Sequence, residues 1–221
     1  MLGGWGHHGL DLEGHGMLVE KYISDALILW ATIDPISTLV LFASLTSNLD
    51  KVRRRRTAVR AFAFSTGILL IAIVLGQFIL TAMGISMLAF QVAGGMVLFL
   101  FALQLIYSHA AWSQSSSVAS DRDMAVFPLA IPSIASPGAI MAVIVLTDNH
   151  LYPTSIQLGT AAITVGILLV TLGLMLLSTR VLALIRPQGA EMLVRVMGLI
   201  LAALSVQLII DAFGLSSLFP T

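Results

Sequence analysis

Six apolar segments, each long enough to cross a lipid bilayer, take up most of this 221-residue chain. A helix needs roughly 20 apolar residues to span the hydrocarbon core, and the segments of this length are 23–47, 57–83, 85–107, 124–147, 155–179 and 190–213. Hydrophobic residues make up 58% of the chain and charged residues only 10%, with a mean hydropathy of +1.00. A soluble domain needs more polar side chains than this to keep its surface wet. The sequence therefore predicts an all-α, polytopic membrane protein with six transmembrane helices.

Basic residues lie mostly on one side of the predicted membrane protein. They gather in or beside the first, third and fifth loops: Lys51, Arg53, Arg54, Arg55, Arg56, Arg60, Arg122, Arg180 and Arg186. The opposite side has only Lys21. Because Lys and Arg bias short loops toward the cytoplasm, we expect both termini on the periplasmic or extracellular side. The arginine run 53–56 then serves topology, and binding of anionic lipid or nucleic acid is the other interpretation of the run.

The chain contains an internal repeat. Residues 95–106 match residues 198–209 at a shift of 103, and the Asp-Pro pair at 34–35 matches the Ser-Pro pair at 136–137 at a shift of 102. Since each copy holds three spans, an odd number, the second copy enters the membrane upside down. This arrangement is an inverted repeat with a pseudo-two-fold axis in the membrane plane.

The repeat sets the expected domain organisation. In chain order we expect an exposed N-terminal tail (1–22), a first three-helix repeat (23–108), a cytoplasmic linker (109–123), a second three-helix repeat (124–214) and a C-terminal tail (215–221). The tail contains His7, His8 and His15 among glycines, a setting in which we expect no specific metal site.

A proline lies near the middle of the first and of the fourth apolar segment. Pro35 and Pro137 have no backbone N–H, so the carbonyls four residues earlier lose their helical partners. In lipid such carbonyls must be satisfied elsewhere in the protein or line a polar cavity. Asp34 and Ser136, directly before the prolines, are preferred N-cap residues, and proline is preferred at the first helical position. Each pair therefore predicts a broken helix that starts again at mid-membrane.

Two helix starts that face each other suit a compact substrate. The free N–H groups and partial positive charge of a helix N-terminus favour an anionic group such as a carboxylate, and small side chains around both prolines leave room for it. The residues expected at this substrate-binding site are Thr32, Asp34, Pro35, Ser37, Gln104, Ser133, Ser136, Pro137, Gly138 and Gln207. The alternative is that the prolines only kink packed helices and the small residues serve close helix contact.

Asp34 places an ionisable side chain at a depth where insertion costs roughly 2.5 to 3.5 kcal/mol. The carboxyl group can be protonated, can cap its own helix, or can bind a cation or the ammonium group of a substrate, and these interpretations stay open. Asp25 and Asp211 lie near the outer ends of the first and last spans, where we expect carboxylates to reach water.

Residue patterns typical of enzymes do not occur in the sequence. The chain has no cysteine, which excludes disulfides and thiolate metal sites. It also has no Gly-rich phosphate loop, no array of His boxes and no G-x-S-x-G turn. We therefore expect no enzymatic activity, no cofactor and no bound metal.

Longer motifs resemble one known family. In chain order they are DPIS at 34–37, ASLT at 43–46, FQVAGG at 90–95, DMAVFPLAIPSIASPGAI at 123–140, RVMG at 195–198 and VQLII at 206–210. Over about residues 23–214 the chain closely resembles the MarC family of bacterial inner-membrane proteins. Members usually have Asn where this chain has Asp34, Gly where it has Ser136, and Asn where it has Asp211.

The resemblance implies a multi-pass protein of the bacterial inner (cytoplasmic) membrane. The family is grouped with six-span neutral amino acid transporters and, more distantly, with the lysine-exporter superfamily. It thus implies secondary transport or export of small neutral amino acids or related metabolites by alternating access. The expected partners are the small-molecule substrate, the lipid bilayer and a coupling ion, H⁺ or Na⁺, with no nucleic acid. Homo-oligomer formation stays open.

Two other functions compete with this one. A cation or metal carrier is favoured if the Asp34 carboxylate is ionised and faces a cavity. A non-transporting protein with a structural or regulatory role is favoured if Asp34 and Ser136 are buried in dry helix contacts. A water-accessible space between these two side chains favours transport.

Overall fold

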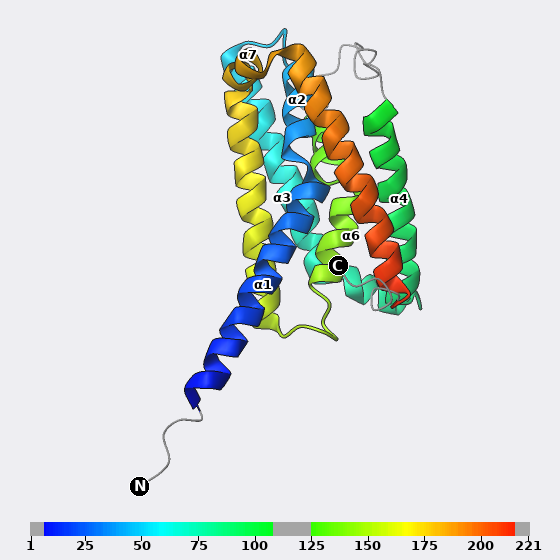
Figure 1. Cartoon of the computed structure of the whole chain (residues 1–221). Helices are drawn as coiled ribbons and strands as arrows, with labels where there is room; N and C mark the ends of the chain where they lie inside the picture. The colour runs from blue at the N-terminus through cyan, green and yellow to red at the C-terminus, as the bar shows by residue number, and fades with distance from the viewer. Residues whose placement is uncertain (1–6, 108–124, 215–221) are drawn as a thin grey trace.

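The computed structural model describes residues 7–107 and 125–214, apart from the side chains of residues 7–15, 126–128, 132, 182–188 and 190, and every regular element within these ranges is a helix. In chain order the elements are α1 (His7–Ile33), α2 (Pro35–Leu45), α3 (Lys51–Ala82), α4 (Met87–Tyr107), the π-helix η2 (Ala125–Ile134), α6 (Pro137–Leu146) and α7 (Thr154–Ala212). They run roughly along one axis as a bundle (Figure 1). The predicted all-α class is confirmed.

Within the described residues, five stretches of helix are long and apolar enough to cross a membrane. They are Gly16–Leu45, Lys51–Ala82, Met87–Tyr107, Thr154–Val181 and Glu191–Ala212. The expected fourth span, 124–147, is instead two helices of 10 residues each, η2 and α6. These two helices follow one another through the middle of the bundle (Figure 1). The protein is therefore polytopic, with five long spans and two short helices in the place of the fourth expected span.

The last helix, α7, contains two membrane-length stretches in 59 residues. Figure 1 shows it passing along the bundle, turning over at one end and returning beside α4. Residues 180–189, where we expected a loop, are helical. The stretch contains Pro187 and Gly189, residues that kink or weaken a helix, and α7 changes direction at this end of the bundle.

The region 1–22 differs from the expected tail because α1 already begins at His7. Residues 16–20 are exposed, as expected of this region, but they are helical and continue directly into the first span. Leu, Glu, Met and Lys in this region favour helix, which explains the extension. The expected linker 109–123 and C-terminal tail 215–221, and the side chains of His7, His8 and His15, lie outside the described residues.

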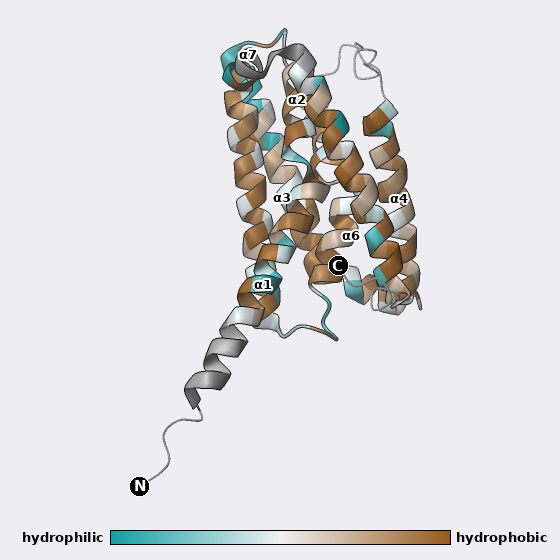
Figure 2. Ribbon diagram, in the orientation of Figure 1, coloured by the Kyte–Doolittle hydropathy of each residue, from teal (hydrophilic) through white to brown (hydrophobic). Residues whose placement is uncertain are grey.

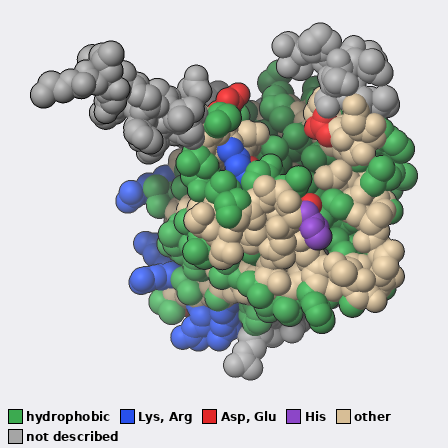
Figure 3. Space-filling view, turned by 90° about the horizontal axis from the view of Figure 1, so that it is seen from below, with side chains coloured by type: hydrophobic (Ala, Val, Ile, Leu, Met, Phe, Trp, Pro, Cys, Tyr) green, Lys and Arg blue, Asp and Glu red, His purple; other side chains and the backbone are tan. Residues whose placement is uncertain are grey.

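The outer surface of the bundle is apolar and several polar side chains are inside. Val74 and Phe78 of α3 are each 72% exposed, and Leu100 of α4 is 65% exposed. Buried Thr164 and Thr171 of α7 donate their hydroxyl hydrogens to carbonyls one turn earlier, each at 2.8 Å. Figures 2 and 3 show hydrophobic residues along the length and flanks of the helices. This distribution suits a protein whose solvent is lipid.

The interrupted helices form the centre of the bundle. The span Gly16–Leu45 contains most of α1 and all of α2. In its most apolar window 56% of the residues are buried, against 22–33% in the same windows of the other four spans. Most residues of α6 are buried as well. The two broken segments are therefore surrounded by α3, α4 and α7, which face the lipid.

α4 and the second half of α7 meet through two glycines. A Cβ atom on Gly95 would lie 3.1 Å from the carbonyl oxygen of Ser205, and a Cβ atom on Gly198 would lie 3.1 Å from that of Ala102. The contact is reciprocal, since positions 95 and 102 correspond to 198 and 205 at the shift of 103 residues. Small residues allow two helix backbones to approach this closely.

We expect Gly95→Ala to destabilise the protein, because the added methyl group meets a helix backbone that cannot move independently. Overpacking of this kind costs about 1–3 kcal/mol. The matched control is Gly166→Ala in the first half of α7, where a new Cβ meets nothing within 4 Å and the change should be neutral or stabilising by up to about 1 kcal/mol. Thermal unfolding in detergent, followed by circular dichroism, measures both variants. Equal unfolding midpoints would contradict the close contact.

Candidate functional site

The first apolar span is interrupted at Asp34. α1 ends at Ile33 and α2 begins at Pro35, and Asp34 between them has a φ of 48°, in the left-handed region that few side chains adopt. Asp34 Oδ1 accepts a hydrogen bond from the backbone N–H of Ser37 at 3.1 Å. The predicted helix start is confirmed, with Asp34 as N-cap and proline at the first helical position.

A second helix start lies at Ser136. α6 begins at Pro137, and Ser136 Oγ accepts a hydrogen bond from the backbone N–H of Ala139 at 3.0 Å. This predicted start is confirmed too. The helix before the break, η2, is a π-helix, which the sequence analysis did not predict. π-Helical turns are rare in proteins, and those that occur often lie at functional sites.

The two helix starts touch each other. The Ser136 hydroxyl donates to the carbonyl oxygen of Thr32 at 3.0 Å, and the hydroxyls of Thr38 and Ser133 share a hydrogen bond of 3.0 Å. The Thr32 carbonyl belongs to the last turn of α1, where carbonyls have no helical partner. All four residues are at most 7% exposed. The breaks thus form one closed, hydrogen-bonded contact at the centre of the bundle.

Asp34 is only partly satisfied in this contact. Its side chain is 2% exposed, and Oδ1 caps α2. Oδ2 has no hydrogen-bond partner among the described residues, and neither has the buried Ser37 Oγ one turn further on. An unpaired buried polar atom is unfavourable. Capping therefore accounts for one carboxylate oxygen and leaves the other free to accept a proton, an ammonium group or a small cation.

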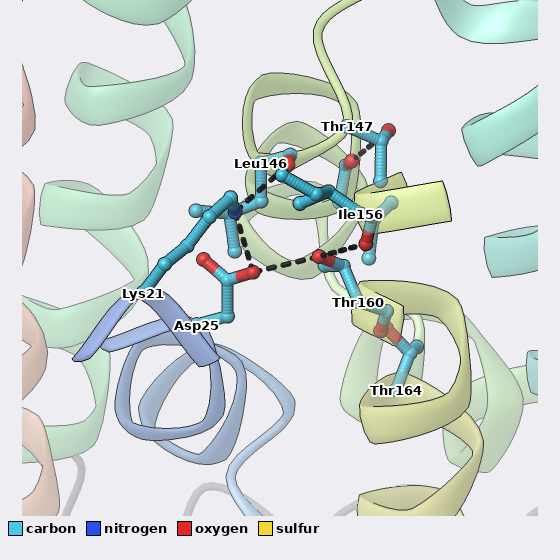
Figure 4. A network of polar contacts seen from close by, with 8 residues as sticks. Lys21, Asp25, Leu146, Thr147, Ile156, Thr160 and Thr164 are labelled. Atoms are coloured by element: carbon cyan, nitrogen blue, oxygen red, sulfur yellow. Dashed lines mark hydrogen bonds and ion pairs between the residues drawn. The ribbon is translucent and has the colours of Figure 1, made fainter. Parts of the chain in front are cut away.

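A polar network holds the far end of α6. Lys21 Nζ of α1 forms an ion pair of 2.7 Å with Asp25 Oδ2, which also accepts a hydrogen bond of 2.7 Å from the Thr160 hydroxyl. Figure 4 shows both contacts. Lys21 Nζ donates to the Leu146 carbonyl at 3.5 Å and lies 3.9 Å from the centre of the Tyr152 ring. Asp25 is 2% exposed, so the expectation that it reaches water is wrong, because packing against α7 covers its ion pair.

A second cation holds the far end of α2, at the opposite end of the bundle. The Arg54 guanidinium donates to Thr179 Oγ1 at 2.7 Å and to Ser178 Oγ. It also lies 5.5 Å from the centre of the Phe42 ring, in the last turn of α2. Each short helix that starts at the centre is therefore held at its outer end by a basic side chain from another helix.

Comparison with known proteins identifies the family of this chain. The model of the family described as MarC family integral membrane protein matches residues 19–218. The chain belongs to the MarC family. The inner membrane protein YhgN of Escherichia coli K12, a UPF0056 protein, is 30% identical over 194 residues, which are 87% of this chain and 96% of YhgN. A UPF0056 membrane protein of Buchnera aphidicola subsp. Schizaphis graminum is 30% identical over 193 residues, with the same coverage. No solved structure matches.

Two of the expected site residues lie elsewhere in this MarC-family protein. Gln104 of α4 and Gln207 of α7 are exposed on the outside of the bundle, and Gln207 Nε2 donates to Asp211 Oδ1 at 2.8 Å. The buried face of α4 consists of Gly95, Leu98, Ala102 and Leu105. The helical phase turns Gln104 away from this face, so placing the glutamines at the helix starts was wrong.

The other expected residues lie at or beside the two breaks, with different surroundings. Pro35 is buried and Pro137 is exposed. A Cβ on Gly138 would overlap the Leu98 side chain, so this glycine lets α4 pack against the start of α6. Its small size serves helix contact in this structure, as the alternative interpretation of the small residues proposed.

The two cation contacts at the outer ends were not predicted from the sequence. The spacing of Lys21 and Asp25, four residues apart on one helix, is a recognisable signal for an ion pair. Arg54 gives no such signal, because it is one of four consecutive arginines and nothing in the local sequence sets it apart. Only the position of α7 beside α3 distinguishes it from its neighbours.

Ser136→Ala should destabilise the MarC-family bundle by about 2–4 kcal/mol, because it removes the α6 cap and leaves the buried Thr32 carbonyl unpaired. The matched control is Ser86→Ala, which removes a cap from an exposed site, where Ser86 Oγ accepts from the Ala89 N–H at 3.2 Å. Chemical denaturation in mixed micelles compares the two free energies of unfolding. A loss no larger for Ser136→Ala than for Ser86→Ala would contradict the bridging role.

Lys21→Met should destabilise more than the double change Lys21→Met with Asp25→Leu. The single variant leaves a buried carboxylate without its cation, which costs roughly 3 kcal/mol or more, whereas an apolar pair of similar volume is often tolerated. The same denaturation experiment measures both. If the double variant were the less stable of the two, Asp25 would have a stabilising role that does not depend on Lys21.

Proposed function

We propose that this MarC-family protein is a secondary transporter or exporter of small neutral amino acids or related metabolites, working by alternating access about the two central helix starts. The observation that carries the proposal is the buried Asp34 Oδ2, which lies beside the starts of α2 and α6 and has no partner among the described residues. Irregular backbone at mid-membrane is characteristic of transporter binding sites.

The chemistry of the two starts suits a zwitterion. Free N–H groups at the helix N-termini favour the substrate carboxylate, and Asp34 Oδ2 with Ser37 Oγ can accept its ammonium group. Ser136 and Thr38 are engaged across the contact. Substrate binding would replace these two hydrogen bonds with bonds to the carboxylate, and the helices would separate by the width of a small molecule.

The proposed architecture has six spans in two inverted halves, with η2 and α6 together as the fourth. Three observations support it: the reciprocal glycine contacts of α4 and α7, the two helix starts 102 residues apart, and the matching ends of α2 and α6. At those ends Thr46 and Thr147 each donate a side-chain hydrogen bond to the carbonyl four residues earlier, both at 2.6 Å.

We propose that the protein lies in the inner membrane, as the name of YhgN states for that relative. The start of α1 and the end of α7 then lie outside, and the arginine run 53–56 lies in the cytoplasm. The start of α1 and the end of α7 lie at one end of the bundle, and α3 begins at the other (Figure 1). In this orientation the Lys21 network closes the outer side and the Arg54 contacts close the inner side. A groove of about 530 Å³ beside Lys21, Ser24 and Tyr152 is the proposed outer approach.

Two other functions each have one observation in their favour. The unpartnered Asp34 Oδ2 also suits a carrier of small cations, with no amino acid involved. The burial of Asp34 and Ser136 in direct helix contacts suits a protein that does not transport, in which the prolines serve packing. Transport requires this contact to open, whereas a packing role of the prolines does not.

The test is counterflow of labelled glycine, alanine and serine into proteoliposomes that contain the purified protein. We expect exchange by the wild type and a decrease of at least tenfold in Asp34→Asn, because the ammonium group loses its charged partner. The control variant is Gln104→Ala, whose side chain is exposed on α4 and should leave exchange unchanged.

Lactate, which resembles alanine without the ammonium group, separates the possibilities. Poor exchange of lactate with good exchange of alanine would support recognition of the ammonium group by Asp34. Absence of exchange for every amino acid, with protein shown to be folded and inserted, would overturn amino acid transport. Uptake of labelled Na⁺ or of protons under the same conditions would then identify a cation carrier.

A further inference from the structure

Two grooves lie next to each other at the end of the bundle where α3 begins. The first, of about 610 Å³, lies between α3 and α7 and contains Lys51, Arg54, Arg55 and Arg180. The second, of about 620 Å³, follows α3 and contains Lys51, Arg55, Arg56 and Arg60. Lys51 and Arg55 belong to both, so the grooves form one continuous cationic surface. Figure 3, which views the bundle from the opposite end, shows Lys and Arg side chains gathered on one side of the molecule.

Most of these cations have no structural task in the described part of the protein. Arg54 is engaged by Ser178 and Thr179. Lys51, Arg55 and Arg56 are exposed and make no hydrogen bond or ion pair with any described residue. A cluster of positive charges repels itself unless anions lie nearby. Within the described part of the chain, no carboxylate is paired with these side chains.

The grooves also contain exposed apolar side chains beside the charges. Val52 and Val59 are 66% and 45% exposed in the second groove, and Leu176 and Leu177 are 44% and 51% exposed in the first. Both grooves lie at the ends of helices that span the membrane. Positive charge next to apolar surface at this level matches a phospholipid, whose phosphate lies at the headgroup and whose acyl chains lie deeper.

We propose that the two grooves form a binding site for an anionic phospholipid with two phosphate groups, of the diphosphatidylglycerol class. One phosphate lies in each groove, and Lys51 and Arg55 lie between them. Basic pockets between membrane helices bind such headgroups, and Arg forms bidentate hydrogen bonds with phosphate oxygens. The role does not depend on transport. It goes beyond topology as well, because topology needs only the number of charges near the membrane, whereas a lipid site needs Arg55 at this position.

The test is native mass spectrometry of the purified full-length protein, titrated with diphosphatidylglycerol, phosphatidylglycerol or phosphatidylcholine. We expect the wild type to bind diphosphatidylglycerol at least tenfold more tightly than phosphatidylcholine, and more tightly than phosphatidylglycerol. Arg55→Gln should lower the affinity for diphosphatidylglycerol about fivefold, as expected for one cation at a lipid surface.

Arg195→Gln is the matched control, because it also removes one arginine but from a pair with Glu191 outside both grooves. Its affinity should equal that of the wild type. Thermal unfolding without lipid should give the same midpoint for Arg55→Gln and wild type, since Arg55 contacts no described residue by hydrogen bond or ion pair.

Three results would overturn the proposal. The first is equal affinity of the wild type for diphosphatidylglycerol and phosphatidylcholine. The second is an equal loss of affinity in Arg55→Gln and Arg195→Gln, which would mean general attraction by net charge. The third is complete displacement of the lipid by millimolar inorganic phosphate, which would mean that the grooves bind free phosphate and do not recognise the lipid.

Discussion

The hydrogen bond from the Ser136 hydroxyl to the Thr32 carbonyl joins the two interrupted helices at the centre of the bundle. Prolines at 35 and 137 remove helical hydrogen bonds at a depth where lipid offers no replacement. Two hydrogen bonds between the breaks satisfy part of this need, Ser136 to the Thr32 carbonyl and Thr38 with Ser133. Because these groups have to be shielded from lipid, α2 and α6 take the centre, and α3, α4 and α7 take the periphery.

Both breaks start a helix with a side-chain cap followed by proline, but the backbone conformation and the charge of the cap residue differ. The Ser136 hydroxyl accepts a hydrogen bond from its own helix and donates one to the other break. Asp34 uses one oxygen as a cap and keeps the second without a partner among the described residues. Two similar helix starts at the centre of the bundle thus differ in charge. This difference in charge is why we propose a zwitterion as the ligand: its anionic group suits the helix N-termini and its cationic group suits Asp34.

The sequence predicted the features that depend on local chemistry. N-cap residues followed by proline predicted both helix starts, and hydrophobic length predicted six spans, of which five are membrane-length helices in the described residues. Features that depend on helical phase and on neighbours were missed. Gln104 and Gln207 are polar in apolar segments, which says nothing about the direction they face. Asp25 was expected to reach water, because nothing near it in the sequence indicates that α7 covers it. Its contact in α7, Thr160, lies 135 residues later in the chain.

The sequence by itself determined membrane insertion, the approximate spans and the two mid-span helix starts, because hydropathy, capping and the missing proline N–H act within a few residues of the chain. Tertiary structure alone decided that the two starts meet, that Arg54 among four arginines holds α2, and that one oxygen of Asp34 has no partner among the described residues. Each of these depends on which atoms lie opposite one another. That placement follows from packing seven helical elements together, and no local pattern contains it.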